Sequence, residues 1–457
     1  MKRLLLVFVA VGFISCSFDN KTGIWKDASN TPVDNQTSKS ITDNKLSTRY
    51  EDIFTKNKTF SEEKDIANLS NIEISNPVKI SNWSEQYAIS SNNISNFSYS
   101  DNKILLSKSP KLSKLSHSKN NSNKKIVFYK NNLISYDHKG TIFVYSLSLN
   151  KKIFKYNFYR KNFKKFNKEI SFIVNKNVLY AADNLGYMYA LNLDDNSIIW
   201  AKNYGIPFRS NLKLANNQIF LANQDNVIYS INPKTGEKNW QFATSLTFLK
   251  SDFENNFALD SVNKNLFFLN TSGELYSINY LTNKINWLLN FKNSSLAEDA
   301  ELFFSQPITV KKNNLIIITE KTILSYNNLT SEKKWNFFAE PIFKPILTLN
   351  YTFVILKNNL LICLDNTNGK IVWSQNIFKN IKNKKIKNKF KSVVDFKIVN
   401  NEINIYSKNG YLLSFNYKNG NLNYHRKISK NGISSEVIFL NNNMLFIDED
   451  NKLLKFN

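Results

Sequence analysis

The stretch Gly-Tyr-Met-Tyr-Ala-Leu-Asn at residues 186–192 is the phrase from which this chain is built. It returns as Gly-Glu-Leu-Tyr-Ser-Ile-Asn at 273–279, and more loosely at 226–232 and 410–416. Eight copies follow one another at intervals of 38 to 51 residues. A period of about 40–50 residues made of short strands is typical of a β-propeller. The hydrophobic anchors of the eight copies are Phe143, Tyr189, Tyr229, Tyr276, Leu324, Ile362, Leu413 and Leu454.

Each repeat has the same order of segments. A β-rich run such as 177–182 comes first, a turn and the anchored strand follow, and after a second turn comes a large aromatic residue. Short alternating runs separated by turn residues indicate antiparallel strands. We therefore expect an all-β, eight-bladed propeller of four-stranded antiparallel blades. The aromatic side chains would fill the wedge between blades, each burying about 150–250 Å²; they are Phe154, Trp200, Trp240, Trp287, Trp335, Trp373 and Tyr424.

The eighth repeat stops where its aromatic strand should begin, so the last blade lacks one strand. An unassigned β-like segment, 103–107, lies just before the first repeat, with a second candidate at 111–115. We expect one of them to complete the last blade, because such a clasp removes an exposed sheet edge.

The N-terminus has the pattern of a targeting signal. A basic start at Met1–Arg3 precedes ten apolar residues, too few to span a bilayer. Phe13-Ile14-Ser15-Cys16 then resembles a bacterial lipobox, which implies a signal peptide at 1–15 and lipid attachment at Cys16. Residues 16–77 are polar with little periodicity, so we expect a lipid-anchored disordered tether. The propeller is then expected at 78–457.

Composition narrows the functional classes. The net charge is +25, but the lysines are scattered among asparagines along the whole chain. The densest basic run, 381–391, is most simply a solvated connection between repeats, and anionic lipid or an acidic partner is the alternative. We do not expect nucleic acid as a partner. Cys363, mid-strand and without a second cysteine in the body of the chain, is expected to be a buried apolar residue.

Catalytic motifs do not emerge from the sequence. The three histidines, His117, His138 and His425, are not at metal-ligand spacing, and no Gly-rich phosphate loop or Gly-x-Ser-x-Gly occurs. We therefore expect no catalytic residues, no metal and no cofactor, and a binding module rather than an enzyme.

The phrase Gly-x-x-Tyr-Ala-Leu-Asn followed by x-Thr-Gly-x-x-x-Trp resembles the PQQ-type β-propeller repeat, with good copies at 187–200, 226–240 and 366–373. That repeat occurs in PQQ-dependent dehydrogenases, whose resemblance would imply adjacent cysteines and acidic calcium ligands. The chain has neither pattern. It also occurs in the BamB family of the outer-membrane β-barrel assembly machinery, which is similar to this chain in its order of lipobox, tether and eight repeats.

The BamB resemblance implies a non-enzymatic scaffold on the periplasmic face of the outer membrane. Its expected partners are the POTRA domains of BamA, other assembly components and, as a further option, unfolded outer-membrane proteins. In that family the contact lies in connections between blades. The matching residues here are Leu246, Phe248, Leu249 and Lys250 after Trp240, Phe208 and Arg209 after Trp200, and Asp299 and Glu301 after Trp287. The alternatives are a quinoprotein dehydrogenase and a propeller scaffold of another envelope complex.

Overall fold

The computed structural model describes residues 17–18, 25–26, 49–50, 59–66, 72–102, 104–113, 125–159, 163, 166–247, 250, 254–255, 257–291, 302–381, 387, 390 and 392–457. The chain divides into two compact units, residues 1–45 and 46–457. In the first, β1 (Ser17–Phe18) pairs antiparallel with β2 (Trp25–Lys26). The second holds the whole propeller. Within the described residues, no helix is long and apolar enough to cross a membrane.

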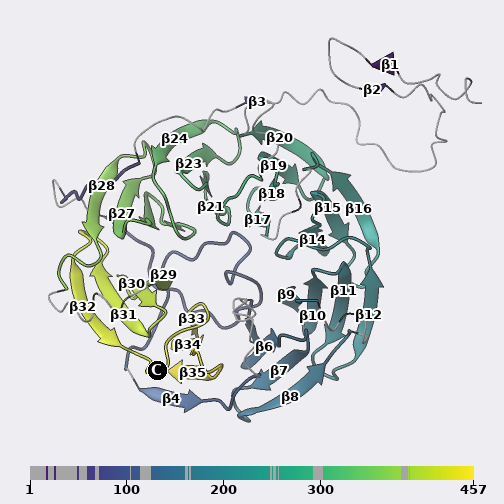
Figure 1. Ribbon diagram of the computed structural model, residues 1–457, viewed down its shortest axis with the longest axis horizontal. Helices are drawn as coiled ribbons and strands as arrows, with labels where there is room; N and C mark the ends of the chain where they lie inside the picture. Colours follow the sequence, from purple (N-terminus) through teal and green to yellow (C-terminus); the bar gives the residue numbers. More distant parts are fainter. Residues whose placement is uncertain are drawn as a thin grey trace, which may run out of the picture. The chain divides into compact units, whose positions relative to one another are not determined.

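Eight four-stranded antiparallel sheets form a closed ring, which we number as blades 1 to 8 along the chain (Figure 1). Blade 1 consists of β5 (Val127–Tyr129), β6 (Asn132–Tyr136), β7 (Ile142–Ser146) and β8 (Lys151–Tyr156), and blade 2 of β9 (Ile170–Asn175), β10 (Val178–Asp183), β11 (Tyr187–Asn192) and β12 (Ile198–Asn203). Blade 3 consists of β13 (Lys213–Ala215), β14 (Gln218–Ala222), β15 (Val227–Ile231) and β16 (Lys238–Ala243), and blade 4 of β17 (Phe257–Asp260), β18 (Asn265–Leu269), β19 (Glu274–Asn279) and β20 (Lys284–Asn290).

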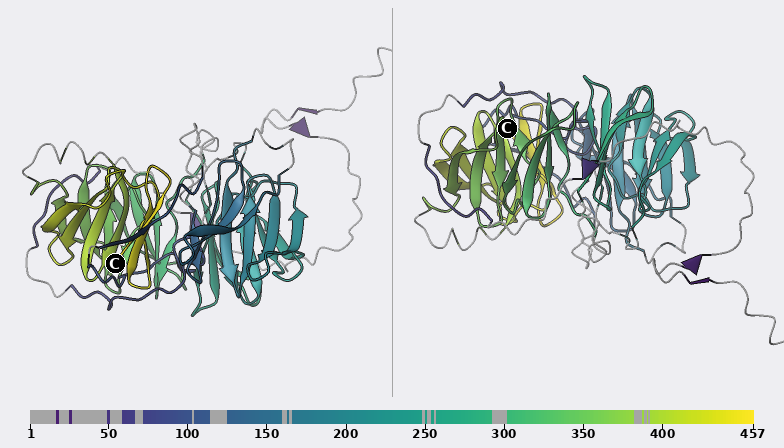
Figure 2. Two further views of the ribbon diagram at one scale, coloured as in Figure 1. Left: turned by 90° about the horizontal axis from the view of Figure 1, so that it is seen from below. Right: turned by 90° about the horizontal axis from the view of Figure 1, so that it is seen from above.

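Blades 5 to 7 continue the same order. Blade 5 consists of β21 (Thr309–Lys311), β22 (Asn314–Ile318), β23 (Thr322–Asn327) and β24 (Lys333–Phe338). Blade 6 consists of β25 (Ile346–Leu347), β26 (Tyr351–Ile355), β27 (Leu360–Asp365) and β28 (Ile371–Asn376). Blade 7 consists of β29 (Val393–Val399), β30 (Glu402–Ser407), β31 (Tyr411–Asn416) and β32 (Leu422–Lys427). Seen edge-on, the strands run across the thickness of the ring (Figure 2).

The sequence repeat maps onto the blades as expected. In every blade the anchor residue lies on the third strand, and in blades 1 to 7 the aromatic residue lies on the fourth, outermost strand. A register shift interrupts the pairing of these two strands in each of those blades, for example between Ala190 and Leu191. The first strands of blades 3 to 6 contact one another around the axis of the ring. The predicted all-β, eight-bladed propeller is confirmed.

Outer-strand tryptophans join neighbouring blades. The Trp200 indole donates to the carbonyl oxygen of Pro233 in the next blade at 2.9 Å, and Trp335 donates to Asn366 at the same distance. Each indole covers a glycine of that next turn: a Cβ on Gly236 would lie 2.7 Å from Trp200. Because both positions also have positive φ, glycine satisfies two requirements there at once.

The ring closes through a strand from before the first repeat. Blade 8 consists of β33 (Ile438–Leu440), β34 (Asn443–Ile447), β35 (Leu453–Phe456) and β4 (Leu105–Lys108). Strand β4 pairs antiparallel with β35, with Ser107 opposite Lys455. The first of the two segments proposed from the sequence therefore completes the last blade, and the second, beginning at Lys111, follows it along the edge of β35 through the Leu112–Asn451 hydrogen bond.

The polar stretch 80–100, here called the axial segment, lies inside the ring (Figure 1). It meets the eight blades in their own order. Trp83 exchanges backbone hydrogen bonds with Phe128 of blade 1, the backbone carbonyl of Ser90 accepts from Leu259 of blade 4, and Phe97 bonds Ile398 of blade 7. Further contacts are Ser84 with Val174 of blade 2, Glu85 with Lys213 of blade 3, Ser91 with Val310 of blade 5 and Asn93 with Leu347 of blade 6. Ile80 and Ser100, at the two ends of the segment, bond Asn441 and Asn442 of blade 8.

Short polar side chains of the axial segment form hydrogen bonds with backbone groups at the inner edges of the blades. The Asn92 amide donates to the carbonyl oxygens of Phe257 and Ile308 at 2.8 and 2.9 Å. Lys213, which is fully buried, donates to the Glu85 carboxylate at 2.6 Å and to Asn92 at 2.7 Å. The inner edges would otherwise leave buried backbone groups unpaired, which proteins avoid.

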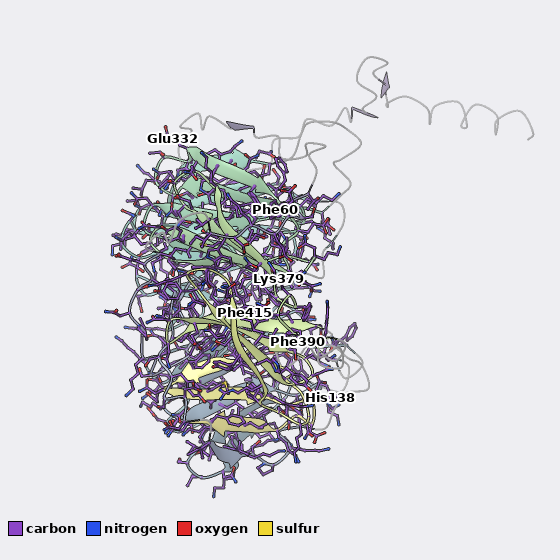
Figure 3. The ribbon with its side chains drawn as sticks, turned by 90° about the vertical axis from the view of Figure 1, so that its left-hand side faces the viewer. Phe60, His138, Glu332, Lys379, Phe390 and Phe415 are labelled. Atoms are coloured by element: carbon purple, nitrogen blue, oxygen red, sulfur yellow. The ribbon has the colours of Figure 1, made fainter. Side chains whose placement is uncertain are left out.

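Residues 49–50 and 59–66, which precede the axial segment, lie along the outer rim. Strand β3 (Arg49–Tyr50) adds to β20 of blade 4 in parallel, and Lys64 exchanges two 2.8 Å backbone hydrogen bonds with Ser374 of blade 6. Phe60 packs on Phe337 of blade 5 with ring centroids 5.4 Å apart, and Glu63 pairs with Lys379 at 2.8 Å. Figure 3 shows Phe60 and Lys379 on the same side of the ring. We call residues 49–50 and 59–66 the rim arm.

These contacts differ from the expectation of a disordered tether over 16–77. Residues 59–66 lie on the rim, and Ile72 is fully buried in the hydrophobic cluster of blades 6 and 7. The segment has few apolar residues, but Phe60, Ile66 and Ile72 each pack against a hydrophobic cluster of the ring. The low average hydrophobicity of this segment therefore gave no indication of these three packing contacts. Cys16 lies outside the described residues.

Candidate functional site

One face of the ring carries all the connections that were predicted to bind a partner. Because the four strands of a blade alternate in direction, the turn between its second and third strands and the link to the next blade emerge at the same face. We call this the connection face. The other face carries the turns that join first to second and third to fourth strands.

The connection after β16 is held in place by a polar network. The Ser245 hydroxyl donates to Glu274 of blade 4 at 2.7 Å, and Thr244 donates to the backbone of Asn226 at 2.8 Å. Glu274 also accepts from Tyr276 at 2.8 Å. Burial and this carboxylate both raise the pKa of Tyr276. A loop fixed by so many bonds presents its remaining side chains in a defined position.

Two of the residues predicted in this connection lie at the surface. Leu246 is 69% exposed, unusual for leucine, and the Lys250 side chain is 44% exposed. The Lys250 ammonium pairs with Asp225 of the β14–β15 turn at 2.5 Å. Phe248 and Leu249 lie outside the described residues. An exposed aliphatic residue beside an ion pair has the composition of a small docking patch.

The connection after β20 contacts the same β18–β19 turn as the connection after β16. Thr247 and the backbone of Phe303 both bond Thr271 of the β18–β19 turn, at 3.1 and 2.8 Å. Asp299 and Glu301 lie outside the described residues, but Phe304, just beyond them, is 45% exposed. Sequence reasoning missed Phe304, because one phenylalanine in a loop has no distinguishing pattern.

The connection after β12 lies alongside, but Phe208 is not a surface anchor. Its side chain is buried, and its ring lies 5.4 Å from Tyr204 and 6.0 Å from Tyr229. Phe208 is therefore part of the core between blades 2 and 3. Arg209 pairs with Glu169 at 3.1 Å, and its carbonyl oxygen accepts from Asn255 at 2.7 Å. The structure thus brings Arg209 and Asn255, in the connections after β12 and β16, into contact, while Phe208 is buried.

A cluster of buried charges surrounds the axial segment at the blade connections. Lys397 pairs with Asp395 at 2.9 Å and with Glu436 at 3.6 Å. The Lys344 ammonium lies 5.4 Å from the centre of the Tyr87 ring. Burial raises the pKa of Glu436 to about 7 and lowers that of Lys344 to about 8. Tyr87 adopts φ of 64°, a backbone conformation that bulky residues seldom take.

The titratable side chains of the described residues are not clustered like metal ligands. No group of three or more His, Cys, Asp or Glu side chains in that part of the chain is arranged to hold a metal ion. The axial segment contacts the inner edge of every blade, so the centre of the ring is occupied by the chain itself. Cys363 is buried mid-strand, and burial raises the pKa of its thiol.

Comparison with known proteins agrees with the repeat. Residues 150–375 match the family model described as outer membrane protein assembly factor BamB. Over these residues, just under half of its length, the chain is similar to BamB proteins, which agrees with a propeller built of PQQ-type repeats. A curated BamB of Legionella pneumophila (strain Paris) is 33% identical over 69 residues, which are 15% of this chain and 17% of that protein. The chain thus matches less than a fifth of the length of this relative.

Solved structures share the fold at low identity. BamB from Moraxella catarrhalis superposes with a TM-score of 0.60 at 12% identity, covering 78% of this chain and 99% of that one. The quinohemoprotein alcohol dehydrogenase of Comamonas testosteroni gives 0.59 at 8% identity, covering 86% and 83%. A BamB and a dehydrogenase therefore fit this eight-bladed fold almost equally well, so the fold alone does not separate their functions.

Proposed function

We propose that this chain is a non-enzymatic scaffold of the outer-membrane β-barrel assembly complex, docking on the POTRA domains of BamA at the connection face of blades 2 to 4. The observation that carries the proposal is the meeting of the connections after β12, β16 and β20, where Leu246 and Phe304 are exposed near the Lys250–Asp225 pair. Exposed apolar side chains beside charged groups are the usual composition of a transient interface.

The axial segment supports a scaffold rather than a quinoprotein dehydrogenase. It places Trp83, Asn92 and Phe97 at the inner strand edges, and Asn92 and Phe97 are buried there together with Lys213. Because these residues fill the centre of the ring, the two faces and the rim are the surfaces at which a partner can bind. If the purified chain oxidised an alcohol with an artificial dye after PQQ and calcium were added, the dehydrogenase alternative would replace this proposal.

The lipid anchor belongs to the same proposal. Cleavage before Cys16 and acylation of that cysteine would hold the propeller at the periplasmic face of the outer membrane. Labelling of cells with a radioactive fatty acid would show transfer to the wild-type chain and none to Cys16→Ser.

Docking is tested by measuring the affinity of the chain for the POTRA domains of the BamA from the same organism. We expect Leu246→Ala with Lys250→Glu to raise the Kd about ten-fold or more, as loss of a central contact does. The matched control is Leu281→Ala, an equally simple truncation of a leucine that is 49% exposed in the β19–β20 turn on the opposite face.

The control should bind like the parent chain, and all variants should melt at the same temperature. If the parent chain shows no affinity for the POTRA domains, but affinity purification from membranes recovers a different envelope complex, the scaffold serves that complex instead. If Leu246→Ala with Lys250→Glu binds as tightly as the parent, the docking surface lies elsewhere.

A further inference from the structure

The seam between blades 8 and 1 is built differently from the other blade junctions. At Trp200, Trp335 and Trp373, an outer-strand indole covers the glycine turn of the following blade. The outer strand of blade 8 is β4, whose sequence Leu-Leu-Ser-Lys contains no aromatic residue. Its apolar side chains remain at the surface instead: Ile104 is 58% exposed and Leu106 48%.

Strand β8 of blade 1, on the other side of this seam, carries three lysines. Strand β8 begins Lys151-Lys152-Ile153, and Lys155 follows two residues later. Lys152 is paired in register with Tyr145, and Lys155 with Phe143. Because Tyr145 and Phe143 belong to the hydrophobic cluster of blade 8, both lysines lie on the blade face that is turned towards β4. Figure 1 shows β4 and β8 adjoining on the rim.

Strand β8 concentrates three exposed lysines that have no polar partner among the described residues. Within the described part of the chain, Lys151, Lys152 and Lys155 form no ion pair and no side-chain hydrogen bond, and all three are exposed. Lys152 only stacks over the Phe143 ring, 4.7 Å from its centre. Several cations of other outer strands have partners: Lys202 pairs with Glu237, Lys334 with Asn314 and Arg426 with Asp101. Lys284 and Lys427 resemble the β8 lysines in having no such partner among the described residues, but each is the one lysine of this kind on its strand.

We propose that this seam, formed by Ile104, Leu105 and Leu106 of the β4 region and by Lys151, Lys152, Ile153 and Lys155 of β8, binds the surface of an anionic lipid bilayer. Unpaired ammonium groups attract lipid phosphates, while their methylene stems and the neighbouring aliphatic side chains enter the interfacial layer. The exposed aliphatic side chains Ile104 and Leu106 favour a lipid surface, because they can enter the interfacial layer but offer nucleic acid neither stacking nor hydrogen bonds.

The test measures binding of residues 46–457, which form a compact unit of their own, to phosphatidylcholine vesicles with and without phosphatidylglycerol. We expect binding only to the anionic vesicles, weakening as salt is added. Replacing all three lysines by glutamine (K151Q, K152Q, K155Q) should weaken it about 100-fold, since each lysine held at such a surface contributes about five-fold.

The matched control removes three lysines from other outer strands (K238Q, K333Q, K334Q) and has the same net charge. It should weaken binding by no more than about three-fold, because charges away from the contact act only through a screened field. Ile104→Ser should also weaken binding, without any change of charge. Thermal unfolding of each variant shows that the ring is intact.

Several results would overturn the proposal. Equal losses in the two triple variants would mean that the net charge, not the seam, attracts the vesicles. Complete displacement by inorganic phosphate would indicate a site for small anions. Binding of RNA through the same lysines, with no binding to vesicles, would assign the seam to nucleic acid. POTRA affinity is measured on a different face and separates this proposal from the docking function.

Discussion

The indole of Trp200 in blade 2 lies directly against Gly236 in blade 3, and its ring nitrogen donates to Pro233 in the same turn. One contact thus joins two repeats through three residues: Trp200 of one repeat, and Pro233 and Gly236 in the turn of the next. Packing between neighbouring blades, as well as strand pairing within a blade, therefore constrains which residues the repeat can carry.

Gly236→Ala should lower the free energy of unfolding by about 2–4 kcal/mol. A residue with a Cβ is strained at the φ of +71° observed here, and that carbon would approach Trp200 to 2.7 Å. Gly205→Ala is the matched control: its φ is +83°, but nothing lies within 4 Å. It should cost about 1–2 kcal/mol. Equal costs in urea denaturation would mean that the tryptophan contact adds nothing to the backbone strain.

Lys213→Met should lower the free energy of unfolding by about 3–5 kcal/mol, because it leaves the Glu85 carboxylate without its buried partner. Adding Glu85→Leu should recover much of the loss. Lys202→Met breaks the exposed pair with Glu237 and should change stability by no more than about 1 kcal/mol. If Lys213→Met is as mild as Lys202→Met, the axial segment does not depend on this ion pair.

The acidity of Glu436 gives the stability a pH dependence of known sign. Burial raises its pKa from 4.5 to about 7, and the nearby Asp395 adds to this, while Lys397 and Lys344 oppose it. Between these two pH values the folded chain binds more protons than the unfolded chain at this site, so stability falls as pH rises. Glu436→Gln should therefore flatten denaturation midpoints measured across that range. Exposed Glu237→Gln should leave the slope unchanged.

N-terminal truncations should separate a tether from a structural element. A chain that begins at residue 59 keeps Phe60, the axial segment and β4, so we expect it to unfold as cooperatively as the full chain. A chain that begins at residue 114 loses the inner hydrogen bonds and the fourth strand of blade 8. We expect it to lose the sharp calorimetric transition. A sharp transition in this shorter chain would show that the eight repeats close without help.

The sequence predicts the blades because their signals are local and repeated. The anchor of each third strand, the aromatic of the fourth and the turn residues between them all lie within about 50 residues. The missing last strand was equally visible, since the eighth copy stops short and β4 precedes the first.

The axial segment and the rim arm could not be predicted in the same way. Asn92 and Ser95 are ordinary loop residues in the sequence, and only the ring shows that they pair with backbone groups of blades 4, 5 and 6. Phe208 was misjudged for a related reason. A phenylalanine beside Pro207 in a loop is consistent with an exposed anchor, and its burial depends on Tyr204 and Tyr229 from two blades.

Phe208→Ala should therefore act on stability rather than on partner binding. Removing a buried ring that packs on Tyr204 and Tyr229 should cost about 3–5 kcal/mol. Phe304→Ala is the variant for comparison. Phe304 is 45% exposed in the neighbouring connection, so loss of its ring should change the free energy of unfolding by about 0.5 kcal/mol or less. We expect the opposite order for POTRA affinity, with Phe304→Ala weakening it and folded Phe208→Ala binding normally. Urea denaturation and binding of the two variants, measured under one set of conditions, give both orders. A variant pair that changes stability equally would contradict the assignment of Phe208 to the core.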